Sequence, residues 1–242
     1  MENNLEGKVA LVTGATRGLG RELSNYLSRL GVKIVGIGRD TGKLKELEEE
    51  IKNNGGDILC YQLDICDFDG IKETVNQVIE KWNTIDILIN NAGVDNRDPF
   101  EKLKKQDIDS ILDINLKGTI YMSRHVIPIM MKQRKGHIIN ISSVAGLRGY
   151  QNGMYSATKF GMNGFGDAMS KYLINHNIHV VTLCPGGINT SWWEKHKFPR
   201  GNTDILIKPQ EISRLVEFIL KGDPNTLFKN VVLAPVCDVE IL

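Results

Sequence analysis

The chain has 242 residues, of which 41% are hydrophobic and 24% are charged. These proportions are ordinary for a globular protein and exclude a disordered chain, and the length suffices for one α/β domain with a substantial buried core. Thirty basic side chains nearly balance 29 acidic ones, which leaves a net charge of +1. No overall field therefore favours nucleic acid or an anionic membrane as a partner.

Two further counts restrict location and chemistry. The chain begins with the polar stretch MENNLEGKVALV, and no apolar run is long enough to span a bilayer. We therefore expect a cytoplasmic protein without a membrane partner. The four cysteines (60, 66, 184 and 237) include no CxxC pair and no histidine spacing suited to zinc. They are predicted to be buried free thiols, and no metal site is expected.

Short runs rich in β-branched residues alternate along the chain with longer segments whose apolar residues recur every three or four positions. This pattern is typical of a parallel sheet covered by helices. The predicted strands are 9–13, 32–37, 58–63, 85–90, 137–141, 178–183 and 231–233. The predicted helices are 19–30, 43–53, 68–82, 108–133, 155–175 and 211–220. Ligands of such sheets bind at the carboxyl ends of the strands, so the residues that follow each strand are inspected first.

The first of these turns is rich in glycine. It has the sequence TGATRGLG, in which Gly14, Gly18 and Gly20 lead directly into the first helix. Glycine permits a tight turn and close approach of a ligand, while the free N–H groups of a helix N-terminus attract a pyrophosphate. The turn therefore predicts a dinucleotide site.

The second strand ends in GIGRD, which bears on the choice of dinucleotide. An acidic side chain near this position holds the adenosine ribose in many NAD enzymes, and Asp40 could do so. Asp before a helix is also a common N-cap, and Arg39 with Arg17 offers two cations to a 2′-phosphate. The pattern favours NADP(H) over NAD(H), with an NAD-dependent enzyme as the alternative.

Several later motifs, together with the glycine turn, resemble those of the short-chain dehydrogenase/reductase family. Asp64 and Ile65 lie in QLDI, NNAG occupies 90–93, and PGGINT occupies 185–190. The motifs occur in the family's order over nearly the whole chain. Those that match the family's catalytic residues are Asn115 in DINLKG, Ser143 in ISSVAG, and Tyr155 and Lys159 in YSATK. The most similar subgroup comprises NADPH-dependent carbonyl reductases, including 3-oxoacyl-carrier-protein reductases.

The resemblance implies a Rossmann-type doubly wound parallel sheet of about seven strands, formed by residues 1–242 as a single domain. It also implies a homotetramer or homodimer and a small carbonyl or alcohol substrate. The cofactor residues that it implies are Gly14, Thr16, Arg17, Gly18, Leu19, Gly20, Arg39, Asp64, Ile65, Asn91, Ala92, Gly93, Tyr155, Lys159, Pro185, Gly186, Ile188 and Thr190.

The chemistry of ketone reduction accounts for the catalytic residues. Hydride transfer leaves negative charge on the substrate oxygen, so the site needs a proton donor and a second polarising donor. Tyr155 can supply the proton if a cation stabilises its phenolate, because the reference pKa of tyrosine is about 10. Lys159 lies four positions later, on the same helical face, and is expected to lower that pKa. By resemblance, Asn115 bends its helix locally and supports a proton relay.

The second donor is expected to be one of two adjacent serines. The family's usual spacing of thirteen positions before the tyrosine selects Ser142, whereas the SSxxG register selects Ser143, twelve positions before Tyr155. We prefer Ser143, because Val144, Ala145 and Gly146 reproduce the family pattern that follows the serine. In addition, a loop can lose one residue more easily than the end of a strand can shift its register.

Substrate contacts are assigned to Ser143, Tyr150 and Trp192, with a substrate-binding loop at about 187–208. A loop of that length inside a compact domain is commonly functional. Two function classes follow from the sequence. The first is an NADP(H)-dependent enzyme that interconverts a carbonyl and a secondary alcohol, and the second is a non-catalytic dinucleotide-sensing protein on the same fold.

Overall fold

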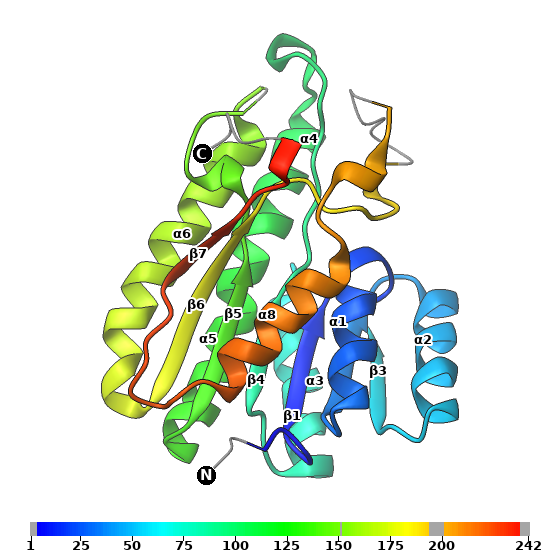
Figure 1. Cartoon of the computed structure of the whole chain (residues 1–242), viewed down its shortest axis with the longest axis vertical. Coiled ribbons are helices and arrows are strands. Elements are labelled where there is room, and N and C mark those ends of the chain that lie inside the picture. Colours follow the sequence, from blue (N-terminus) through cyan, green and yellow to red (C-terminus); the bar gives the residue numbers. More distant parts are fainter. Residues whose placement is uncertain (1–3, 151, 194–200, 238–242) are drawn as a thin grey trace.

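A computed structural model describes residues 4–150, 152–193 and 201–237. The chain forms one seven-stranded sheet in which every neighbouring pair is parallel, in the order β3-β2-β1-β4-β5-β6-β7 (Figure 1). The strands are β1 (Val9–Thr13), β2 (Lys33–Gly38), β3 (Ile58–Gln62), β4 (Ile87–Asn90), β5 (Gly136–Ile141), β6 (Ile178–Pro185) and β7 (Asn230–Leu233). All seven predicted strands are present, and the doubly wound parallel architecture is confirmed.

Helices follow the strands in the predicted alternation, with one difference. They are α1 (Gly18–Arg29), α2 (Thr41–Asn53), α3 (Phe68–Trp82), α4 (Lys105–Leu112), α5 (Gly118–Gln133), α6 (Met154–Leu173) and α8 (Pro209–Lys221). Short 3₁₀ turns are η1 (Phe100–Lys102), η3 (Val144–Gly146), η4 (Ile174–His176) and η5 (Thr203–Ile205). The single helix predicted over 108–133 is instead two α-helices joined by a π-helical turn, η2 (Asp113–Lys117).

The two faces of the sheet bury separate hydrophobic clusters. In β1, Ala10 and Val12 belong to one cluster, whereas Val9 and Leu11 belong to the other. This alternation arises because successive side chains of a strand point to opposite faces. The first cluster joins the sheet to α1, α2 and α8, and the second joins it to α3, α5 and α6. Both faces are therefore covered, which explains why the strands are almost continuously apolar.

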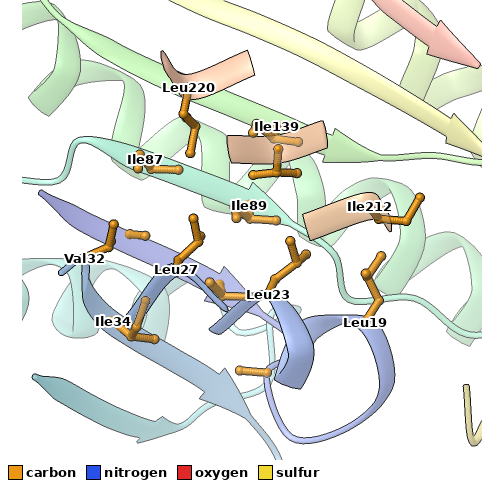
Figure 2. Close-up of a cluster of buried hydrophobic side chains, with 14 of the residues drawn as sticks. Leu19, Leu23, Leu27, Val32, Ile34, Ile87, Ile89, Ile139, Ile212 and Leu220 are labelled. Atoms are coloured by element: carbon orange, nitrogen blue, oxygen red, sulfur yellow. The ribbon is translucent and has the colours of Figure 1, made fainter. Parts of the chain in front are cut away.

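Helix α1 shows how the apolar repeat builds the first cluster. Leu19, Leu23 and Leu27 recur every four residues and lie on one face of the helix. Figure 2 shows them pointing toward strand residues of the sheet and toward Ile212 and Leu220 of α8. Leu23 and Leu27 have no exposed surface, and complete burial of each such side chain contributes roughly 1.5–3 kcal/mol to stability.

The order of the strands determines where a ligand can bind. The chain moves outward from β1 through β2 to β3, then returns to the other side of β1 and continues through β4 to β7. The loops that follow β1 and β4 consequently diverge to opposite faces and leave a crevice at the carboxyl edge of the sheet. Gly14, after β1, has a φ of +66°, and a Cβ atom there would lie 3.0 Å from the Cα atom of Ala92, after β4. Glycine is therefore needed where these loops touch.

Two predictions about composition can be compared with the structure. All four cysteines are free thiols, but only Cys184 is fully buried, and the other three are partly exposed. The prediction of buried thiols is thus wrong in part, because Cys60, Cys66 and Cys237 lie at the margins of the packed layers. Among the described residues, no helix combines the length and apolar character that a membrane crossing requires.

Candidate active site

A cavity of about 500 Å³ runs along the carboxyl edge of the sheet. It begins at the glycine turn after β1 and ends beside Tyr155 in the first turn of α6. All the residues predicted to hold the cofactor line this cavity except Gly20. A Cβ atom at Gly20 would lie 2.2 Å from the carbonyl oxygen of Gly14. Gly20 therefore lets α1 pack on its own turn, and the structure places it behind the cavity wall.

The glycine turn has the features that a dinucleotide pyrophosphate requires. Helix α1 begins at Gly18, and its N-cap residue, Arg17, makes no side-chain hydrogen bond to the first turn. The first N–H groups are thus free of a side-chain cap and suit an anion. Gly18 has a φ of +53°, and a Cβ atom there would lie 3.4 Å from the Cβ atom of Thr190. The residues present fit a nicotinamide dinucleotide.

The part of the cavity that lies beyond the glycine turn, after β2 and β3, carries several cations. Arg17, Arg39 and Lys43 line it together with Asp64, and an Arg39 nitrogen lies 3.9 Å from an Asp64 oxygen. Sequence reasoning missed Lys43, which lies in the first turn of α2. The carboxylate of Asp40 also borders the cavity, but it accepts a hydrogen bond from Lys43 N–H at 3.0 Å and caps α2.

Position 38, at the end of β2, is too crowded for an acidic side chain. A Cβ atom at Gly38 would lie 2.4 Å from the Thr16 methyl group. An acid that reaches the adenosine ribose from this strand end would thus displace Thr16, which itself lines the cavity.

Asn91 lines the cavity, but its amide fastens the two loops of the crevice. Its Nδ2 atom donates to the carbonyl of Thr13 at 2.8 Å, while its backbone N–H donates to the Thr13 hydroxyl at 2.9 Å. The Thr13 hydroxyl also accepts from Ala92 N–H at 3.0 Å. The glycine turn and the NNAG segment are consequently held as one unit.

Tyr155 and Ser143 meet at the far end of the cavity. Both side chains line the cavity, and an interaction with the Ser143 hydroxyl acts to lower the pKa of the Tyr155 phenol. The Ser143 hydroxyl also accepts from Ala145 N–H at 3.1 Å. The hydroxyl of Ser142 instead donates to the backbone carbonyl of Lys159 at 3.3 Å in a buried position. Of the two serines, Ser143 is the one whose hydroxyl lies beside the phenol.

Lys159 lies one helical turn beyond Tyr155 and is almost completely buried. Its ammonium donates to the Ile141 carbonyl at 2.8 Å and lies 5.4 Å from the centroid of the Tyr155 ring. Burial lowers the pKa of this ammonium to about 8, so the lysine still carries its charge near neutral pH.

Several groups around the phenol act on the pKa of Tyr155. Burial raises it, and the negative charge of Asp95 raises it further. The interaction with Ser143 and the charge of Arg97 act in the opposite direction but are outweighed. The Lys159 ammonium bonds to the Ile141 carbonyl, and its expected lowering of the pKa of Tyr155 stays a prediction.

Asn115 lies in the π-helical turn η2 and does not line the cavity. Its amide makes two hydrogen bonds of 2.8 Å to Val94, one to the backbone carbonyl and one from the backbone N–H. A third bond, of 3.2 Å, reaches the Thr158 hydroxyl. The predicted local departure from α-helix is thus present, and Asn115 couples η2 to both the NNAG segment and α6.

The residues predicted to contact the substrate line the cavity together with a charged side chain. Tyr150 and Trp192 line it as predicted, and Trp193 does so as well. Sequence reasoning missed Arg97, which also lines it. Within the predicted 187–208 loop, Asn189 N–H donates to the Ile207 carbonyl at 2.8 Å, which ties its ends together. Residues 194–200 of this loop lie outside the described residues.

In the described part of the chain, no group of three or more His, Cys, Asp or Glu side chains is arranged to hold a metal ion. That no metal takes part in the reaction stays a prediction.

Residues 8–199 match the family model described as short chain dehydrogenase. The chain belongs to the short-chain dehydrogenase family. It is 33% identical over 232 residues to 3-oxoacyl-[acyl-carrier-protein] reductase FabG of Thermotoga maritima, which covers 91% of this chain and 93% of that protein. It is also 34% identical to the 3-oxoacyl-[acyl-carrier-protein] reductase of a Synechocystis strain, over 93% of each chain.

Two solved structures extend the likeness to the whole fold of this short-chain dehydrogenase. A metagenomic short-chain oxidoreductase in complex with NADP superposes with a TM-score of 0.85 at 31% identity, covering 96% of this chain and 99% of that one. Levodione reductase superposes with a TM-score of 0.88 at 25% identity, covering 95% and 96%. The protein is thus an oxidoreductase enzyme that uses a nicotinamide dinucleotide, which sets aside the non-catalytic sensor.

Proposed function

We propose that this enzyme interconverts a small ketone and the corresponding secondary alcohol, with NADP(H) as cofactor. The observation that carries the proposal is the Ser143–Tyr155 hydroxyl pair at the end of a cavity that starts at the glycine turn. The relatives named 3-oxoacyl-[acyl-carrier-protein] reductase support the reaction class.

The bound nicotinamide would supply the hydride that adds to the carbon of the substrate carbonyl, and would take it up when the alcohol is oxidised. Ser143 donates a hydrogen bond to the substrate oxygen and polarises the carbonyl. Tyr155 transfers its proton to that oxygen as the C–H bond forms, and takes it back when the alcohol is oxidised. The polar pair thereby compensates the charge that develops on a single oxygen atom.

Lys159 and Asn115 support these two residues. Lys159, charged near neutral pH, would hold the cofactor's ribose hydroxyls. Its positive charge, 5.4 Å from the centroid of the Tyr155 ring, favours the phenolate of Tyr155. Asn115 fixes Val94 and the start of α6, and we assign to it the support of a proton path from Lys159.

The Tyr155→Phe substitution tests the proton donor. Loss of a general acid–base group costs about 100- to 10,000-fold in rate, so kcat for ketone reduction should fall by that factor while NADPH binding changes little. Activity is followed by NADPH absorbance over a panel of ketones and secondary alcohols, and binding by calorimetry. Tyr172→Phe, an exposed position on the same helix, is the control. Unchanged NADPH consumption by Tyr155→Phe would refute the mechanism.

The preference for NADP(H) is supported by the cation cluster of Arg17, Arg39 and Lys43. The engagement of Asp40 in capping α2 argues against the NAD-dependent alternative. The NADP named in the related oxidoreductase complex is consistent with this preference.

Single substitutions Arg39→Ala and Lys43→Ala test the preference. A hydrogen bond to a charged group contributes about 1.5–3 kcal/mol, so each substitution should lower kcat/KM for NADPH about tenfold or more and leave NADH nearly unaffected. Lys45→Ala is the matched control, because Lys45 is exposed on the same helix. If the ratio of kcat/KM with NADPH to kcat/KM with NADH is unaltered in both variants, other residues hold the 2′-phosphate.

We further propose that the enzyme works in the cytoplasm as a homotetramer or homodimer. Exposed apolar side chains on α5 and α6, Ile120 and Phe160, support association between copies of the chain. Light scattering of the purified protein measures its oligomeric state.

A further inference from the structure

The loop that follows β4 presents two charged side chains to the cavity from a rigidly held backbone. Asn115 clamps the loop at Val94, as described above. Farther along, Asn152 Nδ2 donates to the carbonyl of Asn96 at 2.6 Å and to that of Asp98 at 2.8 Å. Asp95 and Arg97 lie between these clamps, so their positions are set before any substrate binds.

Asp95 and Arg97 form an ion pair in the cavity wall. Arg97 Nε lies 3.4 Å from an Asp95 oxygen, and the side chains are 18% and 5% exposed, respectively. The Arg97 guanidinium also lies 4.7 Å from the centroid of the Trp193 ring. The indole N–H of Trp193 donates to the Ile188 carbonyl at 2.8 Å, which fixes the ring that orients Arg97. Burying an ion pair costs desolvation free energy, and the proposed proton transfer does not require the Asp95–Arg97 pair.

The pair lies close to the reacting end of the cavity. Asp95 exerts the largest electrostatic effect on the pKa of Tyr155, raising it, and Arg97 exerts an opposite effect. Asp95 and Arg97 line the same cavity as Ser143 and Tyr155, so a substrate held in that cavity is exposed to both pairs.

The chemistry of the pair indicates which substrate atoms suit it. A carboxylate only accepts hydrogen bonds, and a guanidinium only donates them. A substrate carboxylate would be attracted by Arg97 but repelled by Asp95, and a substrate ammonium would meet the reverse. A hydroxyl satisfies both residues at once, because its hydrogen donates to Asp95 and its oxygen accepts from Arg97.

We propose that Asp95 and Arg97 select uncharged ketones that carry a hydroxyl group on the carbon next to the reacting carbonyl. In the oxidative direction the corresponding substrate is a vicinal diol. This inference rests on the proposed ketone reduction and assigns its substrate class. Trp193 acts as a positioning residue that holds Arg97 in the wall.

Three four-carbon substrates test the proposal at saturating NADPH. They are butanone, the ketone that bears a hydroxyl beside the same carbonyl, and the keto acid that bears a carboxylate there. Because a site built around a hydroxyl strongly rejects the analogue that lacks it, kcat/KM for the hydroxyketone should exceed that for butanone by about tenfold or more. The keto acid should show no such advantage.

In the variants Asp95→Asn and Arg97→Met, the ratio of kcat/KM for the hydroxyketone to kcat/KM for butanone should fall by about fivefold or more. The inductive effect of the hydroxyl is the same in wild type and variants, and any change in Tyr155 acts on both substrates, so the change in this ratio between wild type and variant isolates the contacts. Arg97→Lys, which retains the charge but loses the planar fork, should give an intermediate ratio. Lys102→Ala, an exposed position after the same loop, should leave the ratio unchanged. Circular dichroism confirms that each variant is folded.

Three results would overturn the inference: equal kcat/KM for hydroxyketone and butanone in the wild type, an unchanged ratio in both variants, or a preference for the keto acid. In each of these the enzyme still reduces ketones, so the proposed function stands. Failure to reduce any ketone or oxidise any alcohol would instead remove both.

Discussion

Adjacent residues Ser142 and Ser143 direct their hydroxyl groups to different partners. Ser143 lines the cavity and acts on the Tyr155 phenol, whereas Ser142 donates to the Lys159 carbonyl beneath the site. The spacing of family motifs left both serines open, because a loop one residue shorter than usual can be aligned in two ways. Only the direction of the side chains, which depends on how β5 ends, distinguishes them.

Substitution by alanine should separate the two serines. Loss of a donor to the developing oxyanion costs about 100- to 1,000-fold in kcat, and we expect this for Ser143→Ala with little change in thermal stability. Ser142→Ala should retain kcat within about threefold and lose ~1 kcal/mol of stability, since it removes a buried hydrogen bond. Steady-state kinetics and urea unfolding measure the two effects, and a larger loss of kcat in Ser142→Ala would reverse the assignment.

The residues found from sequence and those missed differ in the kind of signal they carry. Tyr155 and Lys159 share a helical face, and four-residue spacing predicts that arrangement. Arg97 lies on an irregular loop, where no periodicity indicates which side chains point inward. Lys43 reads as an ordinary surface lysine of a charged helix until the ends of β2 and β3 are placed beside it.

At the level of elements, the π-helical turn η2 is the main departure from the predicted helices. The stretch 108–133 has helical composition throughout, so sequence periodicity gives no sign of the interruption. The cause is tertiary: Asn115 bonds to Val94 and Thr158, which lie on neighbouring elements. The Thr119 hydroxyl then donates to the Asn115 carbonyl at 3.0 Å and satisfies it.

Removal of the Asn115 amide should therefore destabilise the enzyme as well as slow it. Asn115→Ala leaves the backbone N–H and carbonyl of Val94 without their partner, and each unsatisfied buried group costs about 1–3 kcal/mol. We expect a loss of roughly 2–4 kcal/mol in urea unfolding. Thr158→Val removes the longer contact to Asn115 and the bond from the Thr158 hydroxyl to the Tyr155 carbonyl at 2.7 Å, leaves both bonds to Val94 intact, and should cost less. Equal losses in the two variants would contradict the assignment of the clamp to Val94.

At the level of the whole molecule, the element succession was predictable but the strand order was not. Alternating apolar segments identify strands and helices, and burial on both faces accounts for their composition. The return of the chain from β3 to the far side of β1 depends on contacts between distant segments, such as Gly14 against Ala92. The position of the cavity follows from that return.

The amino edge of the sheet, opposite the cavity, contains a stacked pair of histidines. His137 and His179 pack with ring centroids 5.2 Å apart. Burial, and next the charge of His179, lowers the pKa of His137 from 6.5 to about 4. Between these two values the unfolded chain binds a proton that the native state does not, so stability rises with pH across this interval and is lost as the pH falls.

Acid unfolding of a His137→Gln variant tests this coupling. Between about pH 7.5 and pH 4.5, wild type should lose about 2 kcal/mol more stability than the variant, because each unit of pKa difference corresponds to ~1.4 kcal/mol. Above about pH 7 the difference in free energy of unfolding between wild type and variant should be constant. Urea titrations at several pH values give the free energy of unfolding of each protein. If this free energy depends on pH in the same way in both proteins, His137 is not the source of the acid sensitivity.

The cavity is assembled from two separate stretches of chain. The cations proposed to hold the 2′-phosphate, Arg17, Arg39 and Lys43, all precede residue 66, whereas the side chains proposed to contact the substrate all follow Gly93. Mutations that change the coenzyme can therefore accumulate without disturbing the groups that choose the substrate. Recombination near the NNAG segment would exchange one specificity and conserve the other, so the two traits of this enzyme can evolve independently.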